Sequence, residues 1–150
     1  MRIGILGAGR GAYLGQILDR YPGARVVALC DHDAVRLEQG RQRLPNLEAA
    51  YLNLDGWYNH DFELAVIAND ATAHAAHAIR ALAQGRHVLS EVVACNTLAE
   101  AVALARAVDE ANRSASPAVY AFAENCCTMR PTLEIKRLYR AGDLGEYQYG

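Results

Sequence analysis

The sequence lacks the long apolar runs of a membrane protein. None of its apolar segments approaches the roughly 18 residues that cross a bilayer, and we expect no membrane partner. The first of these segments, residues 3–6, is also much shorter than the apolar core of a signal peptide. These two absences predict a cytoplasmic protein.

The sequence also lacks a surplus of positive charge and a metal-binding pattern. Its 15 Lys and Arg residues against 17 Asp and Glu residues give a formal net charge of −2. That balance argues against a nucleic-acid partner. The four cysteines form no C-x-x-C pair, and no histidine stands at zinc-finger spacing from them. We expect ordinary thiols and no metal site.

What the sequence does have is a regular alternation of short apolar runs and amphipathic segments. Hydrophobic residues make up 52% of the 150 residues, enough for the core of one domain. The apolar runs are typical of buried parallel strands, because they are short and do not alternate with polar residues. They cover residues 2–6, 25–30, 64–68, 87–90 and 118–122, with a weaker candidate at residues 48–51. The amphipathic segments cover residues 12–20, 34–44, 73–84 and 98–112.

This alternation predicts an α/β fold, a doubly wound parallel-sheet Rossmann domain. The sixth strand ends at residue 122, so we expect residues 1–122 to form the nucleotide-binding domain. Residues 131–141 are predicted to form one further helix, with proline at its start and glycine after its end. Residues 145–150 resemble the opening of a strand. Residues 123–150 are therefore expected to be a crossover helix and the start of a second domain that this sequence does not contain.

A glycine-rich turn follows the first predicted strand. In residues 7–12, GAGRGA, Gly7 permits a tight turn, Gly9 lets the backbone approach a pyrophosphate, and Ala12 allows close helix–sheet packing. The free N–H groups and the positive dipole end of the following helix can hold the phosphates. Asp31 lies 19 residues after Ala12, where a carboxylate accepts hydrogen bonds from the adenosine ribose. Together these residues predict a dinucleotide site.

Asp31 also favours NAD over NADP. The 2′-phosphate of NADP carries about −1.5 to −2 charges and would lie beside this carboxylate. His32 and Asp33 add no fixed positive charge, although Arg36 one turn along leaves NADP open. We therefore expect NAD as the cofactor.

Polar residues also stand at the ends of the other predicted strands. Asn69 and Asp70 follow the fourth strand, Glu91 follows the fifth, and Asn125 follows the sixth. Because open parallel sheets bind ligands outside the carboxyl ends of their strands, these residues should share one crevice. We expect Glu91 to face the nicotinamide half of the dinucleotide; a solvated loop is the alternative.

Two histidines begin the helix after the fourth strand. His74 fits a place in the crevice and an ordinary helix start equally well, and His77 is read as an ordinary helix residue. The residues expected to contact the cofactor are Gly7, Gly9, Arg10, Gly11, Ala12, Asp31, His32, Asn69, Asp70, Thr72, His74, Glu91 and Asn125.

As a set, these motifs resemble the Gfo/Idh/MocA family (glucose–fructose oxidoreductase, inositol dehydrogenase and relatives). The matching segments are the glycine turn at 7–12, CD at 30–31, VIANDATAH at 66–74, GRHVLSE at 85–91, AEN at 123–125 and LYRAGDLGE at 138–146. The resemblance implies an NAD-binding domain followed by a second, α+β domain, before which this sequence is expected to be truncated. In the family that second domain carries most substrate contacts and the usual oligomer interface, so we expect oligomers only where it is present.

The sequence departs from the family at the position of a reactive lysine. Family members follow the glutamate with Lys-Pro, and that lysine lies by the nicotinamide and the reacting hydroxyl. Here the two positions are Val92 and Val93, and valine can neither donate nor accept a proton. This pattern is similar to a branch with E-V-P-A in place of E-K-P. The resemblance therefore leaves the catalytic residue unknown.

Three functions remain open at this point. The first is an NAD-dependent oxidoreductase that exchanges hydride with a sugar or polyol. The second is a glycosidase or lyase that oxidises a ring hydroxyl transiently and shows no net redox change; the family's NAD-dependent glycosidases look similar around the E-N-C-C stretch at residues 124–127. The third is a nucleotide-binding module that is inactive by itself.

Overall fold

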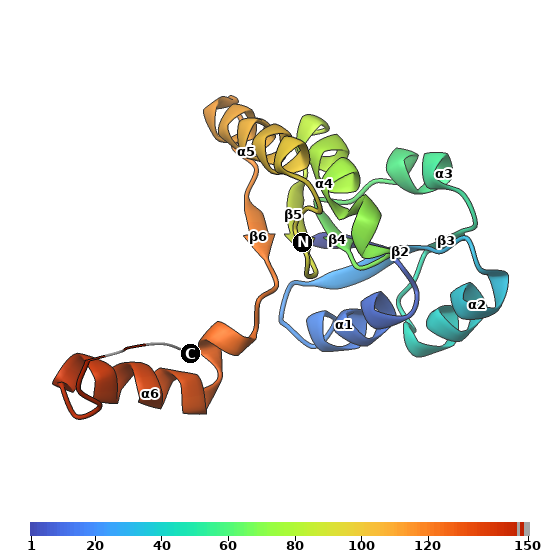
Figure 1. Cartoon of the computed structure of the whole chain (residues 1–150). Helices are drawn as coiled ribbons and strands as arrows, with labels where there is room; N and C mark the ends of the chain where they lie inside the picture. The colour runs from blue at the N-terminus through green and yellow to red at the C-terminus, as the bar shows by residue number, and fades with distance from the viewer. Residues whose placement is uncertain (147, 149–150) are drawn as a thin grey trace.

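A six-stranded sheet organises the computed structural model, which describes residues 1–146 and 148 (Figure 1). The strands are β1 (Arg2–Leu6), β2 (Arg25–Cys30), β3 (Ala49–Tyr51), β4 (Leu64–Ile67), β5 (His87–Ser90) and β6 (Tyr120–Phe122). They lie in the order β3-β2-β1-β4-β5-β6, and every neighbouring pair is parallel. The predicted doubly wound Rossmann fold is confirmed, including the weak third strand.

Helices cover both faces of this sheet. The helices of the described residues are α1 (Arg10–Leu18), α2 (Ala34–Arg43), α3 (Leu54–Asn59), α4 (His74–Ala83), α5 (Leu98–Arg113) and α6 (Arg130–Ala141), with short 3-10 turns η1 (Ala71–Ala73) and η2 (Cys126–Thr128). Figure 1 shows α1 and α2 on one face and α3, α4 and α5 on the other. No helix in the described residues is both long and apolar enough to cross a membrane.

The sheet separates two apolar cores. Ile3 and Ile5 of β1 point into the core under α1 and α2, whereas Leu6 joins the core under α3, α4 and α5. Residues 26–29 of β2 are fully buried, because helices cover both of its faces. The unbroken apolar runs in the sequence are explained by this double burial.

Local signals at the helix ends are satisfied. Thr97 and Glu100 form the expected capping box at the start of α5. The side chain of Asp33 accepts hydrogen bonds from the N–H groups of Val35 and Arg36 at the start of α2. Gly85 has φ +74°, the left-handed conformation typical of a residue that ends a helix.

The short helix α3 was not predicted. Its six residues are too few to show a helical period. Asn53 caps its start by accepting a hydrogen bond from the N–H of Gly56 at 2.8 Å, and burial of Trp57 and Tyr58 holds it on the sheet. Tertiary packing therefore determines this element.

The last helix stands apart from the sheet. α6 matches the helix predicted at residues 131–141, but none of its residues is buried. Figure 1 shows it extending away from the sheet and its covering helices. The strand expected at residues 145–150 falls partly on residues 147, 149 and 150, which lie outside the described part of the chain. The division into residues 1–122 and 123–150 stays a prediction.

Candidate functional site

The glycine-rich turn between β1 and α1 has a backbone that only glycine can adopt at its first position. Gly7 has φ +99°, and a Cβ atom there would lie 2.4 Å from the carbonyl oxygen of Ala68. The N–H of Gly7 donates a hydrogen bond to the carbonyl oxygen of Cys30 at 2.8 Å. The turn is thus held against the ends of both β4 and β2.

The next two glycines of the turn have different surroundings. A Cβ atom on Gly11 would lie 2.5 Å from Cγ2 of Ile5, so Gly11, together with the fully buried Ala12, permits α1 to pack closely on the sheet. A Cβ atom on Gly9 would meet nothing within 4 Å. Gly9 also precedes Arg10 as the N-cap of α1 without a capping side chain. The start of α1 therefore presents free N–H groups to open space.

Asp31 is fixed beside this turn. The residue is only 7% exposed, and its carboxylate accepts hydrogen bonds from the N–H of Ala8 at 2.8 Å and from the N–H of Asp33 at 2.9 Å. Nδ1 of His32 lies 3.6 Å from the same carboxylate. Since each carboxylate oxygen has two lone pairs, acceptor capacity remains for a ligand.

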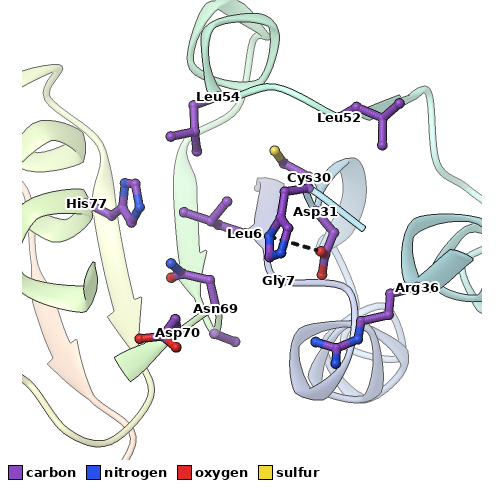
Figure 2. A pocket seen from close by; sticks show the side chains of 12 residues that line it. Leu6, Gly7, Cys30, Asp31, Arg36, Leu52, Leu54, Asn69, Asp70 and His77 are labelled. Atoms are coloured by element: carbon purple, nitrogen blue, oxygen red, sulfur yellow. Dashed lines mark ion pairs between the residues drawn. The ribbon is translucent and has the colours of Figure 1, made fainter. Parts of the chain in front are cut away.

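A cavity of about 340 Å³ opens at this edge of the sheet (Figure 2). Its lining consists of Leu6, Gly7, Cys30, Asp31, His32, Arg36, Leu52, Leu54, Ala68, Asn69, Asp70 and His77. In Figure 2, Asp31 and His77 lie on opposite sides of the cavity, the side chain of Leu6 lies between them, and Leu54 lies above Leu6 in this view. The cavity thus combines an apolar middle with polar groups at both ends, which is the usual composition of a small-molecule site.

The polar residues after β4 take separate roles. Oδ1 of Asn69 is buried and has no hydrogen-bond partner within residues 1–146 and 148. Asp70 instead accepts hydrogen bonds from the N–H and the hydroxyl of Thr72, and these bonds hold the pKa of Asp70 below its ordinary value. Asn69 and Asp70 line the cavity, while Thr72 shapes the loop behind them.

Glu91, at the end of β5, is paired with the glycine-rich turn. Its side chain is 12% exposed, and Oε1 lies 2.7 Å from Nε of Arg10. The two residues line a second hollow of about 170 Å³ together with Phe122, Glu124 and Asn125. The largely buried carboxylate thus has a cationic partner, so Glu91 is not a freely solvated loop residue.

His74 supports the loops around the site. It is 1% exposed, and its ring nitrogens lie 2.9 Å from the carbonyl oxygen of Val93 and 3.2 Å from that of Asn69. It therefore connects the loop after β4 to the loop after β5. Val92 and Val93, joined by a cis peptide bond, are about half exposed.

His77 is a lining residue that the sequence reading missed. Its Nδ1 lies 2.9 Å from the hydroxyl of Tyr58, and the ring borders the cavity. Burial, with smaller effects from Arg80 and His74, lowers the pKa of His77. The only available signal was its position one helical turn after His74, on the same face of α4.

The lowered pKa of His77 predicts a pH-dependent stability. Because the folded state binds this proton less readily than the unfolded state, the contribution of His77 to the free energy of unfolding is present above its ordinary pKa of 6.5 and is lost as pH falls. We expect the urea concentration at the midpoint of unfolding to fall when the pH is lowered from about 7 to about 5. In His77→Gln the same change of pH should lower this midpoint less. An identical pH dependence in the variant would contradict the prediction.

The thiol in the cavity is not a reactive group. Burial, with a smaller effect from Asp31, raises the pKa of Cys30 to about 11, so the thiol stays protonated at neutral pH. Within residues 1–146 and 148, no group of three His, Cys, Asp or Glu side chains is placed to hold a metal ion.

The sequence pattern of an oxidoreductase family with an NAD-binding Rossmann fold, Gfo/Idh/MocA, matches residues 1–118.

The chain is also similar to proteins named glycosyl hydrolase family 109 proteins. It is 31% identical over 157 residues to one from Phocaeicola vulgatus, covering 97% of this chain and 36% of that protein. It is 29% identical over 164 residues to one from Solibacter usitatus, covering 100% of this chain and 36% of that protein. The chain therefore spans little more than a third of the length of these relatives.

Two solved structures illustrate the likeness in fold. Myo-inositol 2-dehydrogenase from Lactobacillus plantarum superposes with a TM-score of 0.83 at 21% identity, covering 97% of this chain and 42% of that one. The WlbA dehydrogenase from Bordetella pertussis, in complex with NADH and UDP-GlcNAcA, gives 0.80 at 20% identity, covering 97% and 41%.

Proposed function

Because the chain belongs to the Gfo/Idh/MocA oxidoreductase family, as its NAD-binding Rossmann domain, we propose that it serves an enzyme that exchanges hydride between NAD and a sugar or polyol. The observation that carries this proposal is the pairing of an open Gly9 with a fixed Asp31 carboxylate at one edge of the sheet. Further support comes from the dehydrogenases of similar fold, one of which has inositol in its name.

The residues present fit the dinucleotide. The open space beside Gly9 gives room for a pyrophosphate, which the N–H groups at the start of α1 would bind. The remaining lone pairs of Asp31 would accept hydrogen bonds from the adenosine ribose. The buried side-chain oxygen of Asn69 accepts no hydrogen bond from the described residues, and a bound ligand could supply the missing donor. We place the nicotinamide half near the hollow lined by Glu91 and Asn125.

Proton transfer needs a base, and the residue at the family's lysine position, Val92, cannot be that base. When bound, NAD supplies an acceptor for hydride, while a base must take the proton of the substrate hydroxyl. Val92 cannot do so. Glu91 is paired with Arg10, and Glu124 accepts a hydrogen bond from the N–H of Cys126 at 3.0 Å. We propose that the base comes from a second domain, for which residues 123–150 form the crossover.

A second candidate is a glycosidase that returns the hydride to its substrate. Transient oxidation of a ring hydroxyl to a ketone acidifies the neighbouring C–H and permits elimination of the aglycone as its alcohol. Water then adds to the double bond, and the hydride returns to the ketone. The curated relatives named as glycosyl hydrolases favour this candidate, as does the absence of lysine at position 92.

One experiment separates the candidates. A full-length protein that includes the proposed second domain, and this chain by itself, are each incubated with NAD and a panel of free sugars, polyols and glycosides. NADH formation, followed by absorbance, would identify a dehydrogenase. Sugar release that requires NAD but forms no NADH would identify a glycosidase. NAD binding with neither reaction would identify a module that is inactive by itself.

Restoring the lysine is expected to give no dehydrogenase activity. Val92 is 43% exposed, so Val92→Lys should be tolerated by the fold. Because Val93 replaces the family's proline as well, we expect Val92→Lys, made in a full-length protein that includes the proposed second domain, to give no increase in NADH formation on free sugars and no gain in NAD affinity. Val93→Lys, at a similarly exposed neighbouring position, is the matched control. NADH formation with Val92→Lys alone would return the protein to the lysine-dependent dehydrogenases.

A further inference from the structure

We propose that Asn69 and His77 recognise the N1/N6 edge of the adenine ring, so that the chain distinguishes adenine from hypoxanthine in its dinucleotide. This inference rests on the proposed binding of NAD at the strand ends. It assigns a specificity role to Asn69, whose side-chain oxygen has no hydrogen-bond partner among the described residues, and to His77, which lines the same cavity.

The order of the strands places the adenine in the larger cavity. β1 lies between β2 and β4, and the glycine-rich turn that would bind the pyrophosphate follows β1. Asp31, the expected ribose ligand, follows β2 and lines the larger cavity, whereas Glu91 and Asn125 follow β5 and β6 and line the smaller hollow. With the ribose at Asp31, the attached base enters the larger cavity, where Leu6, Leu52 and Leu54 can contact its faces.

Asn69 supplies an acceptor at the far side of that cavity. Its Oδ1 atom is buried and receives no hydrogen bond from any residue that the structure describes. Such an atom is costly unless a ligand or water supplies the missing donor. In Figure 2, the Asn69 amide lies on the same side of the cavity as His77. The 6-amino group of adenine is a donor that fits this oxygen.

His77 supplies the complementary donor. The Tyr58 hydroxyl has one hydrogen, and it lies 2.9 Å from Nδ1 of His77 but 3.4 Å from the carbonyl oxygen of the same residue. We assign the hydroxyl hydrogen to the shorter contact, and this assignment makes Nδ1 the acceptor and leaves the hydrogen of the neutral ring on Nε2. Burial raises the pKa of Tyr58 to about 12, which keeps the hydroxyl a donor, and the lowered pKa of His77 keeps the ring neutral.

The geometry selects one edge of the base. Asp31 and His77 lie on opposite sides of the cavity (Figure 2), so the base edge that reaches His77 is the one farthest from the ribose. In adenine this edge carries the N1 acceptor beside the 6-amino donor. Hypoxanthine reverses both groups, with a hydrogen on N1 and an oxygen at position 6. The N1 hydrogen of hypoxanthine would then face the donor of His77, and its oxygen at position 6 would face the acceptor of Asn69.

Calorimetric titration of the chain with NAD and with nicotinamide hypoxanthine dinucleotide tests the inference. We expect NAD to bind at least about fivefold more tightly, the lower end of the discrimination that a bidentate base contact gives. His77→Leu should bring the ratio of the two affinities close to one. Asn69→Ala should also lower it, and serves as a second variant should His77→Leu unfold. Ala76→Gln, on the exposed face of α4, is the control that should keep the ratio.

Two other outcomes have distinct meanings. Equal affinity of the unaltered chain for both dinucleotides, or an unchanged ratio in folded His77→Leu and Asn69→Ala, would overturn the adenine contact while leaving NAD binding in place. Failure of the chain to bind either dinucleotide would overturn the proposed binding of NAD itself, and this inference with it.

Discussion

Replacing Gly9 by valine is expected to abolish NAD binding while the domain stays folded. Gly9 has φ −73°, outside the left-handed region that favours glycine, and a Cβ atom there meets nothing within 4 Å in the described part of the chain. The valine side chain would therefore occupy space that is empty in the structure and that a pyrophosphate needs at the start of α1. We expect no measurable NAD binding by calorimetry and a native far-ultraviolet circular dichroism spectrum.

The neighbouring glycine provides the matched comparison. A Cβ atom on Gly11 would lie 2.5 Å from Cγ2 of Ile5, inside the packed contact between α1 and β1. Gly11→Ala should therefore lower the thermal midpoint of unfolding, as overpacking of a core does, whereas Gly9→Val should leave the midpoint nearly unchanged. Retained NAD affinity in a folded Gly9→Val protein would show that the turn has only a structural role.

Replacing Asp31 by alanine is expected to weaken NAD binding by roughly tenfold or more, because a hydrogen bond to a charged group contributes about 1.5–3 kcal/mol. The same change should also lower stability. The Asp31 carboxylate accepts the hydrogen bond of the Ala8 N–H in a buried position, and leaving such a donor unpaired costs about 1–3 kcal/mol. Urea unfolding measures this second effect separately from calorimetric binding.

Two controls make the Asp31 result specific. Asp31→Asn keeps an acceptor oxygen and should lose less stability than Asp31→Ala. Glu38→Ala removes an exposed carboxylate from α2 that pairs with Arg41 outside the cavity, and should leave NAD affinity unchanged.

Because Asp31 would repel a 2′-phosphate, the unaltered protein should also prefer NAD to NADP. Equal affinity for both dinucleotides would contradict that preference.

The sheet could be predicted because its signals are local. Each buried parallel strand is a short apolar run, as in residues 25–30, and the capping box of Thr97 and Glu100 lies within four consecutive residues. The turn at residues 7–12 and the acidic residue at the end of the second strand likewise follow from spacing along the chain. Such patterns report backbone conformation and burial, and the order of the parallel strands follows from their connections.

The amino-acid sequence by itself therefore determined the Rossmann fold, the position of the glycine-rich turn and the place of Asp31 directly after the second strand. Only the tertiary structure decided that Glu91 pairs with Arg10, 81 positions away, and that Nδ1 of His77 lies 2.9 Å from the Tyr58 hydroxyl while its ring borders the cavity. The sequence likewise does not show that the side-chain oxygen of Asn69 has no hydrogen-bond partner among the described residues. The physical reason is that side-chain pairing and burial depend on distances between segments that are remote in the chain, which no local period encodes.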